Sequence, residues 1–183
     1  MASTAESAFA AVATTAAGLF TGGALYINVV QQPAIHRLGA STTSAVRSSF
    51  FSSMFGLAAP MQATLATISG VTAVTAGLMQ RDRHLLEHNY SKQSTLWLAA
   101  GSLMIAIVPY TVGVMMKFNK KLIDTELAAQ LGDEWLETSL KKWARLHSVR
   151  TGMSIVAFTG MVVALNGVME REASGPKVIV ALD

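Results

Sequence analysis

Four long runs without a single Asp, Glu, Lys, Arg or His determine what this chain can fold into. The runs cover residues 7–35, 48–80, 93–116 and 151–169. A helix rises about 1.5 Å per residue, so about 20 apolar residues cross a hydrocarbon core about 30 Å thick. Each run is therefore long enough to cross a bilayer once. We predict an all-α fold, an integral membrane bundle of four transmembrane helices.

The composition agrees with this prediction, because 51% of the residues are hydrophobic and only 14% are charged, whereas soluble domains carry about 25% charged residues. We treat residues 1–183 as a single four-span domain, with spans at about 8–32, 56–79, 94–116 and 151–169. The first run lacks the basic start and the short apolar core of a signal peptide, so we read it as a retained helix. The absence of cysteine excludes disulfides and thiolate chemistry.

The basic residues are unevenly distributed between the two sides that four spans define. The side of the first and third loops carries nine of the 14 lysines and arginines: Arg37, Arg47, Lys117, Lys120, Lys121, Lys141, Lys142, Arg145 and Arg150. This bias favours cytosolic first and third loops. We expect a multi-pass protein of an intracellular membrane, such as the endoplasmic reticulum. With a net charge of only +3, we expect contact with membrane lipid and no nucleic-acid partner; a homo-oligomer stays possible.

The third loop is the longest segment between spans and has a helical pattern. Along residues 120–147 and just beyond, side chains recur at steps of three and four: Leu136, Leu140, Trp143, His147 and Arg150. Residues at this spacing share one helix face. We predict an amphipathic helix that continues directly into the fourth span. Small residues four apart, such as Ala66 with Gly70 and Ala73 with Gly77, predict close packing between the spans.

Polar side chains in the first span suggest one half of a ligand site. Asn28 and Gln32 lie four residues apart, on one helix face, and Pro33 follows directly. Proline lacks an N–H and disfavours helical geometry at the preceding residue, so we predict a break or kink there, just where the chain reaches His36. Exposed polar groups at such a break could bind a ligand. Hydrogen bonds between helices and a simple helix stop are an equally weighted alternative.

Trp143, His147 and Arg150 share a helix face at the start of the fourth span. An imidazole beside a fixed cation is favoured in its neutral form, which suits a general base, and a guanidinium can stabilise an oxyanion. The alternative is an interfacial belt, with Trp at headgroup depth and Arg reaching lipid phosphate. With four spans, these residues lie on the same side of the membrane as the end of the first span and as the end of the third, where Tyr110 and Asn119 lie.

One further motif, His84-Leu-Leu-Glu-His88, matches the H-x-x-E-H pattern of a zinc-binding helix. It lies in the second loop, on the opposite side of the membrane, without an obvious third ligand. We expect a solvated helix there and assign no metal ligands.

Three stretches carry a resemblance to a known family: GLFTGGALYINVVQQP (residues 18–33), PYTVGVMMKFNKKL (residues 109–122) and WARLHSVRT (residues 143–151). Through these stretches, and through their order and spacing relative to the spans, the chain resembles the small four-span membrane proteins that include the fungal anthrone oxygenases. The third stretch is the most specific. The resemblance implies a monooxygenase that converts an anthrone, a small planar aromatic polyketide of secondary metabolism, to the anthraquinone with O₂ and without flavin or nicotinamide.

Such an enzyme needs an apolar slot, a base for the methylene proton and a donor for the carbonyl oxygen. We assign His147 as the base and His36 as the second candidate, with Arg150 and either Asn28 or Asn119 as oxyanion donors. Trp143 and Tyr26 are assigned as ring-stacking walls, and Gln32 and Tyr110 as further substrate contacts. We expect no cofactor besides O₂ as co-substrate. A bound metal ion stays open, although a ligand set without a carboxylate is a weak signature.

The rival hypothesis is a non-enzymatic four-span protein that binds lipid or quinone, or that scaffolds a partner. It predicts polar side chains dispersed around the helices and no cavity of ligand size. The enzyme hypothesis predicts a cavity, open toward the first and third loops, that Asn28, His147 and Arg150 line.

Overall fold

The computed structural model describes residues 4–39, 41–86 and 92–173, and all of its regular elements there are helical. The elements are α1 Thr4–Tyr26, η1 Ile27–Gln31, α2 Gln32–Leu38, α3 Ser44–Leu86, α4 Lys92–Tyr110, η2 Thr111–Met115, α5 Met116–Leu122 and α6 Thr125–Ala173. The π-helical turns η1 and η2 join α1 to α2 and α4 to α5. Four helical units result, each long and apolar enough to cross a membrane, which confirms the predicted all-α bundle.

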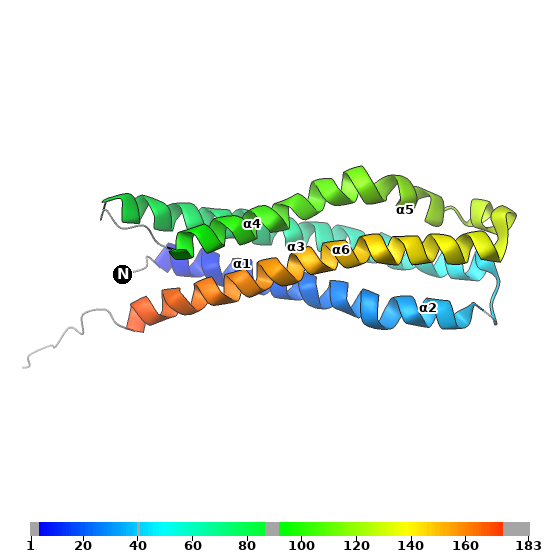
Figure 1. The fold of residues 1–183 in the computed structure, drawn as a ribbon, viewed down its shortest axis with the longest axis horizontal. Helices are drawn as coiled ribbons and strands as arrows, with labels where there is room; N and C mark the ends of the chain where they lie inside the picture. Colours follow the sequence, from blue (N-terminus) through cyan, green and yellow to red (C-terminus); the bar gives the residue numbers. More distant parts are fainter. Residues whose placement is uncertain (1–3, 40, 87–91, 174–183) are drawn as a thin grey trace, which may run out of the picture.

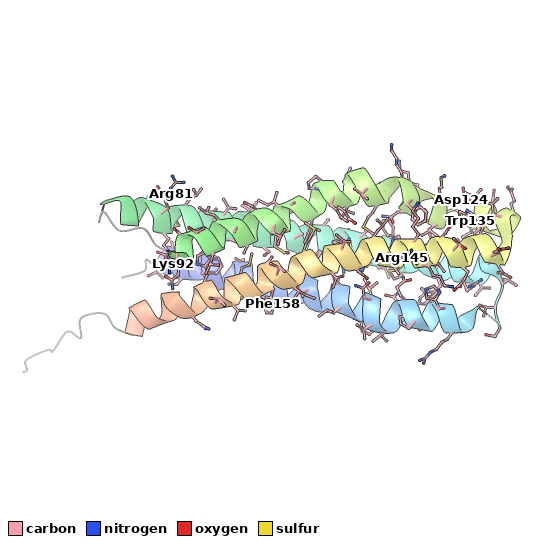
Figure 2. The ribbon with its side chains drawn as sticks, viewed as in Figure 1. Arg81, Lys92, Asp124, Trp135, Arg145 and Phe158 are labelled. Carbon is pink, nitrogen blue, oxygen red and sulfur yellow. The ribbon has the colours of Figure 1, made fainter. Side chains whose placement is uncertain are left out.

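The four units lie side by side along the length of the molecule (Figure 1). The start of α1 lies at one end of the bundle, and the end of α2, the start of α3, the end of α5 and the start of α6 lie together at the other end. Figure 2 shows Arg81 and Lys92 at the first end, and Asp124 and Trp135 at the second. The first and third loops therefore share one end, as the count of spans requires.

The predicted break at Gln32 does not occur, and in its place the helix is distorted by the π-helical turn η1. Gln32 has φ −64° and ψ −48°, which is helical, and its N–H donates to the carbonyl of Ile27, five residues back. The wider π-helical turn brings the chain to Pro33 in the first turn of α2, where a proline, which has no N–H to donate, is tolerated. The chain passes from α1 through η1 into α2 without leaving helical geometry.

The third loop is helical and continues into the fourth span within α6, but no single helix covers residues 120–147, because α5 ends at Leu122 and α6 begins at Thr125. Helix α6 begins after Asp124, whose side chain accepts a hydrogen bond from the Leu127 N–H at 3.0 Å, a typical N-cap contact. Gly132 interrupts its first turns with φ 79°, a left-handed value that favours glycine. Leu136 and Leu140, on the predicted face, are fully buried.

Helices α3 and α4 approach closely through glycines, which confirms the packing role of the small residues on α3. A Cβ atom on Gly77 would lie 3.1 Å from the backbone nitrogen of Leu98, and one on Gly101 would lie 2.9 Å from the backbone nitrogen of Val74. Gly22 on α1 differs, because a Cβ there would meet no atom of the described chain within 4 Å.

Gly101→Ala is expected to destabilise the bundle, because the added methyl group meets backbone atoms of α3 that cannot rotate away. Overpacking of this kind costs about 1–3 kcal/mol. Gly22→Ala is the matched control: its methyl group meets open space, and alanine favours a helix over glycine by about 1 kcal/mol. Thermal unfolding in detergent, followed by circular dichroism, should show a lower midpoint only for Gly101→Ala. Equal midpoints for the two variants would contradict the close contact.

Candidate active site

A cavity of about 130 Å³ lies within the bundle, with walls from α1, α3, the α4–η2–α5 unit and α6. Phe20, Met54, Phe55, Met115 and other apolar residues form most of its wall. The polar lining residues come from three units: Gln62, Thr111, Asn119, Trp143, His147 and Arg150. Figure 2 shows Arg145 on α6 between Trp135, near the first- and third-loop end, and Phe158. His147 follows Arg145 by two residues, so the polar wall lies toward that end.

His147 is the centre of the polar wall and is fully buried. Its Nδ1 lies 2.8 Å from Asn28 Oδ1, and its Nε2 lies 2.7 Å from Arg150 Nη2. Because a guanidinium only donates hydrogen bonds, Nε2 must be the acceptor, and a neutral imidazole then carries its proton on Nδ1. This assignment of the tautomer follows from the hydrogen-bond network. His147 thus has its basic nitrogen on the side of Arg150.

Asn28 fixes the His147 ring from outside the cavity. It lies in the π-helical turn η1, and its Nδ2 donates to Thr151 Oγ1 at 2.8 Å while its Oδ1 accepts from His147. Thr151 in turn donates to the carbonyl of His147 at 3.0 Å. Asn28 is not among the residues that line the cavity. The structure therefore gives it a positioning contact with His147 in place of a direct contact with a ligand.

Arg150 is buried with a neutral partner on each side. Its Nη2 donates to Gln62 Oε1 on α3, at 2.5 Å, as well as to His147. The guanidinium carbon lies 5.6 Å from the centre of the Phe20 ring, a cation–π distance. A buried cation among neutral partners is well suited to an anionic or electron-rich ligand atom.

Trp143 forms an aromatic plate beside the imidazole. The Trp143 and His147 rings stack with their centres 4.7 Å apart, and Phe51 meets Trp143 edge-on at 5.1 Å. The indole Nε1 donates to Asn119 Oδ1 at 2.7 Å, which holds the plate in place. Asn119 and Trp143 both line the cavity, where the sequence analysis placed them as substrate contacts.

Four other residues proposed for substrate or catalysis lie outside the cavity wall. Tyr110 is close by, and its hydroxyl donates to the carbonyl of Leu146 at 3.1 Å, tying α4 to α6. Tyr26 is 60% exposed, because it precedes Asn28 by two residues and so points about 200° around the helix axis from it. Gln32 is buried away from the cavity wall. The fourth residue is His36.

His36 belongs to a separate polar cluster near the first loop. Its Nδ1 lies 2.9 Å from Glu137 Oε1, and Arg47 pairs with both Glu137 and Asp133 at 3.0 and 3.1 Å. His36 does not reach the cavity, so His147 is the base candidate that the cavity retains. No group of three His, Cys, Asp or Glu side chains within the described ranges could hold a metal ion. In the H-x-x-E-H motif, Glu87 and His88 lie outside the described residues.

Gln62 is a polar wall residue that the sequence analysis missed. It is one of two amides in the charge-free run of residues 48–80, and the other, Gln80, lies near the end of that run. An amide deep in an apolar span needs a hydrogen-bond partner inside the bundle. The position of Gln62 in the middle of this run is therefore the sequence signal that could have identified it.

Six polar side chains gather at one cavity, which favours the enzyme hypothesis over its rival, although other polar side chains that we proposed for the site lie elsewhere. Both His147 and Arg150 line the wall, whereas Asn28 stands behind it. Two exposed residues of the wall, Ala63 and Val112, lie within the spans α3 and η2. We infer a mouth of the cavity at these two residues, at the level of the spans.

A comparison with protein families finds a match to the model described as anthrone oxygenase, over residues 50–160. Comparisons with curated proteins and with solved structures find no match. The matched segment covers more than half of the chain and contains all six polar residues of the cavity wall. The family resemblance of the sequence is thereby confirmed, and the chain belongs to the anthrone oxygenase family.

Proposed function

We propose that this protein is a membrane-bound oxygenase that converts an anthrone-type polycyclic aromatic polyketide to its anthraquinone with O₂. The observation that carries the proposal is the buried His147, held by Asn28 and beside Arg150, in the wall of an apolar cavity. A flat, apolar ring system suits the apolar walls and the plate of Trp143. Membership of the family supports oxygenase chemistry.

The reaction begins with loss of a proton from the anthrone methylene, because the resulting anthrolate is a fully aromatic phenolate. The anthrolate transfers one electron to O₂, and the carbon radical and superoxide then combine to form a C–O bond. Protonation gives a hydroperoxide. Loss of the second methylene hydrogen and cleavage of the O–O bond release water and leave the quinone carbonyl. The overall balance is anthrone plus O₂ to anthraquinone plus water, with all electrons coming from the substrate.

His147 Nε2 takes the first proton in this scheme. For this to happen, Arg150 Nη2 must first leave the lone pair of Nε2, and in this scheme it turns to the carbonyl oxygen of the bound anthrone, where it donates as the negative charge develops. Asn28 Oδ1 continues to accept from Nδ1 and keeps the ring oriented. Base and oxyanion donor are thus coupled through the 2.7 Å contact that joins them before the reaction.

Turnover by the purified protein in detergent tests the proposal. An anthrone is incubated with protein under air and under nitrogen, and quinone absorbance is followed, with buffer and heat-inactivated protein as controls for autoxidation. The proposal predicts acceleration over both controls under air and none under nitrogen. Tight binding of the anthrone or quinone without any oxygen-dependent acceleration would instead support a non-enzymatic quinone-binding protein.

Ala63→Trp is expected to reduce kcat/KM for the anthrone, because the indole would narrow the mouth between α3 and η2. Ala63 is exposed there, and Val112 across the mouth is 58% exposed. Ala11→Trp is the matched control, since Ala11 is an exposed alanine of α1 that does not line the cavity. Steady-state kinetics in detergent micelles check the prediction. An unchanged kcat/KM for Ala63→Trp would show that the substrate reaches the cavity by another path.

A further inference from the structure

Gln62 lines the cavity with its amide held in one fixed orientation, and its Nε2 lies on the side of α1, 3.5 Å from the position of a Cβ on Gly23. The residue is 2% exposed and projects from the middle of α3 into the cavity wall. Its Oε1 accepts a hydrogen bond from Arg150 Nη2. Because a guanidinium has no acceptor, the amide cannot be flipped without placing two donors against each other. The NH₂ group of Gln62 must therefore point away from Arg150.

Two buried donors of the cavity wall are left unused. Gln62 Nε2 and Arg150 Nε have no hydrogen-bond partner among the described residues. The other polar wall groups nearby are engaged: Trp143 Nε1 with Asn119, and both nitrogens of His147 with Asn28 and Arg150. Burying a donor without a partner is unfavourable, and both unused groups are donors. A ligand that satisfies them has to bring an acceptor oxygen.

We propose that Gln62 is a specificity-determining residue that donates its amide N–H to the ring oxygen of the ligand, beside Arg150. The ligand class is a planar polycyclic aromatic that carries a carbonyl or phenolate oxygen, and its identity as an anthrone rests on the proposed function. The anthrolate oxygen is more negative than the anthrone carbonyl, so this donor binds it more strongly as the proton leaves. A ring of the same shape without an oxygen leaves both donors unpaired and is disfavoured.

A merely structural Gln62 would act only by holding Arg150, and two substitutions separate that role from a donor role. Gln62→Glu keeps an oxygen that accepts from Arg150 but replaces the N–H donor with a second acceptor, which repels a ligand oxygen. Gln62→Leu removes both contacts. If Gln62 only holds Arg150, Gln62→Glu behaves like the unmodified protein; if Gln62 donates to the ligand, both variants lose recognition of the oxygen.

The experiment measures equilibrium binding of anthraquinone and of anthracene, which have the same three-ring frame with and without oxygens. Quenching of tryptophan fluorescence in the detergent-solubilised full chain reports binding, because Trp143 lines the cavity. The unmodified protein is expected to prefer anthraquinone. Gln62→Glu and Gln62→Leu should each reduce that preference about tenfold, the effect of one hydrogen bond, with anthracene affinity unchanged.

Gln80→Leu is the matched control, since Gln80 is a fully buried amide of the same helix that contacts Glu6 and not the cavity. It should keep the preference for anthraquinone, and unfolding midpoints verify that every variant is folded. The inference is overturned if Gln62→Glu retains the preference, or if the Gln62 variants lose affinity for both ligands alike. Binding needs neither O₂ nor turnover, so the two proposals can fail separately. A preference for anthraquinone over anthracene without catalysis would overturn the proposed function alone. Catalysis without that preference would overturn this inference alone.

Discussion

Replacement of His147 by alanine is expected to lower kcat for anthrone oxidation by about 10²- to 10⁴-fold, the usual contribution of a positioned general base. The imidazole is fully buried, and its Nε2 is the one ring nitrogen left without a proton once Nδ1 donates to Asn28. Alanine supplies no base at this position, and the cavity wall has no second imidazole. Initial rates of quinone formation, corrected for autoxidation, measure the effect.

His36→Ala is the matched control for this prediction. His36 pairs with Glu137 near the first loop and does not line the cavity, so its loss should leave kcat close to that of the unmodified protein. Unfolding midpoints of both variants are needed, because His147→Ala also removes a partner from Asn28 and from Arg150. A folded His147→Ala protein with unmodified kcat would exclude His147 as the base.

Arg150→Met is expected to lower kcat by about 10²- to 10³-fold, because removing one oxyanion donor from a dry site has an effect of this size. Methionine is of similar length and is accommodated in apolar surroundings. It supplies neither the positive charge nor the donor beside His147 Nε2. The loss should appear mainly in kcat, since the charge on the substrate oxygen develops after binding.

Arg150→Lys tests whether the charge alone is sufficient. Lysine keeps the cation and can donate to Gln62 and His147 from its single ammonium nitrogen, as Arg150 does from Nη2, but it lacks the other donors of the guanidinium, such as Nε. We expect an activity between those of the unmodified protein and Arg150→Met. If Arg150→Met retains full kcat, the developing oxyanion has to be stabilised elsewhere, and the coupling proposed between Arg150 and His147 fails.

Features that depend on local periodicity were predictable from the sequence. The runs without charge correspond to the four helical units because bilayer thickness sets the length of a span. Trp143, His147 and Arg150 meet at one wall because steps of three and four residues place side chains on the same face of a continuous helix. The shared end of the first and third loops follows from the number of spans alone.

The side chains around η1 were not predictable, because a π-helical turn changes the register of the helix. Asn28 and Gln32 would share a face in a regular α-helix, but Asn28 lies within η1, and the wider π-helical turn changes the angle between the two side chains. The helix also continues past Pro33. His36 therefore lies about 12 Å further along the axis than Asn28, where it meets Glu137. Gln62 was missed because its role depends on Arg150, a contact between distant segments of the chain.

Deuterium exchange at the anthrone methylene under nitrogen tests the central claim most directly, because it isolates proton removal from all later oxygen chemistry. An anthrone is incubated in D₂O buffer with the unmodified protein, with His147→Ala, with His36→Ala or with no protein, and isotope content is read by mass spectrometry. The account predicts exchange faster than in buffer for the unmodified protein and for His36→Ala, and exchange at the buffer rate for His147→Ala. Exchange at the buffer rate with the unmodified protein, or equally fast exchange with His147→Ala, would contradict the account.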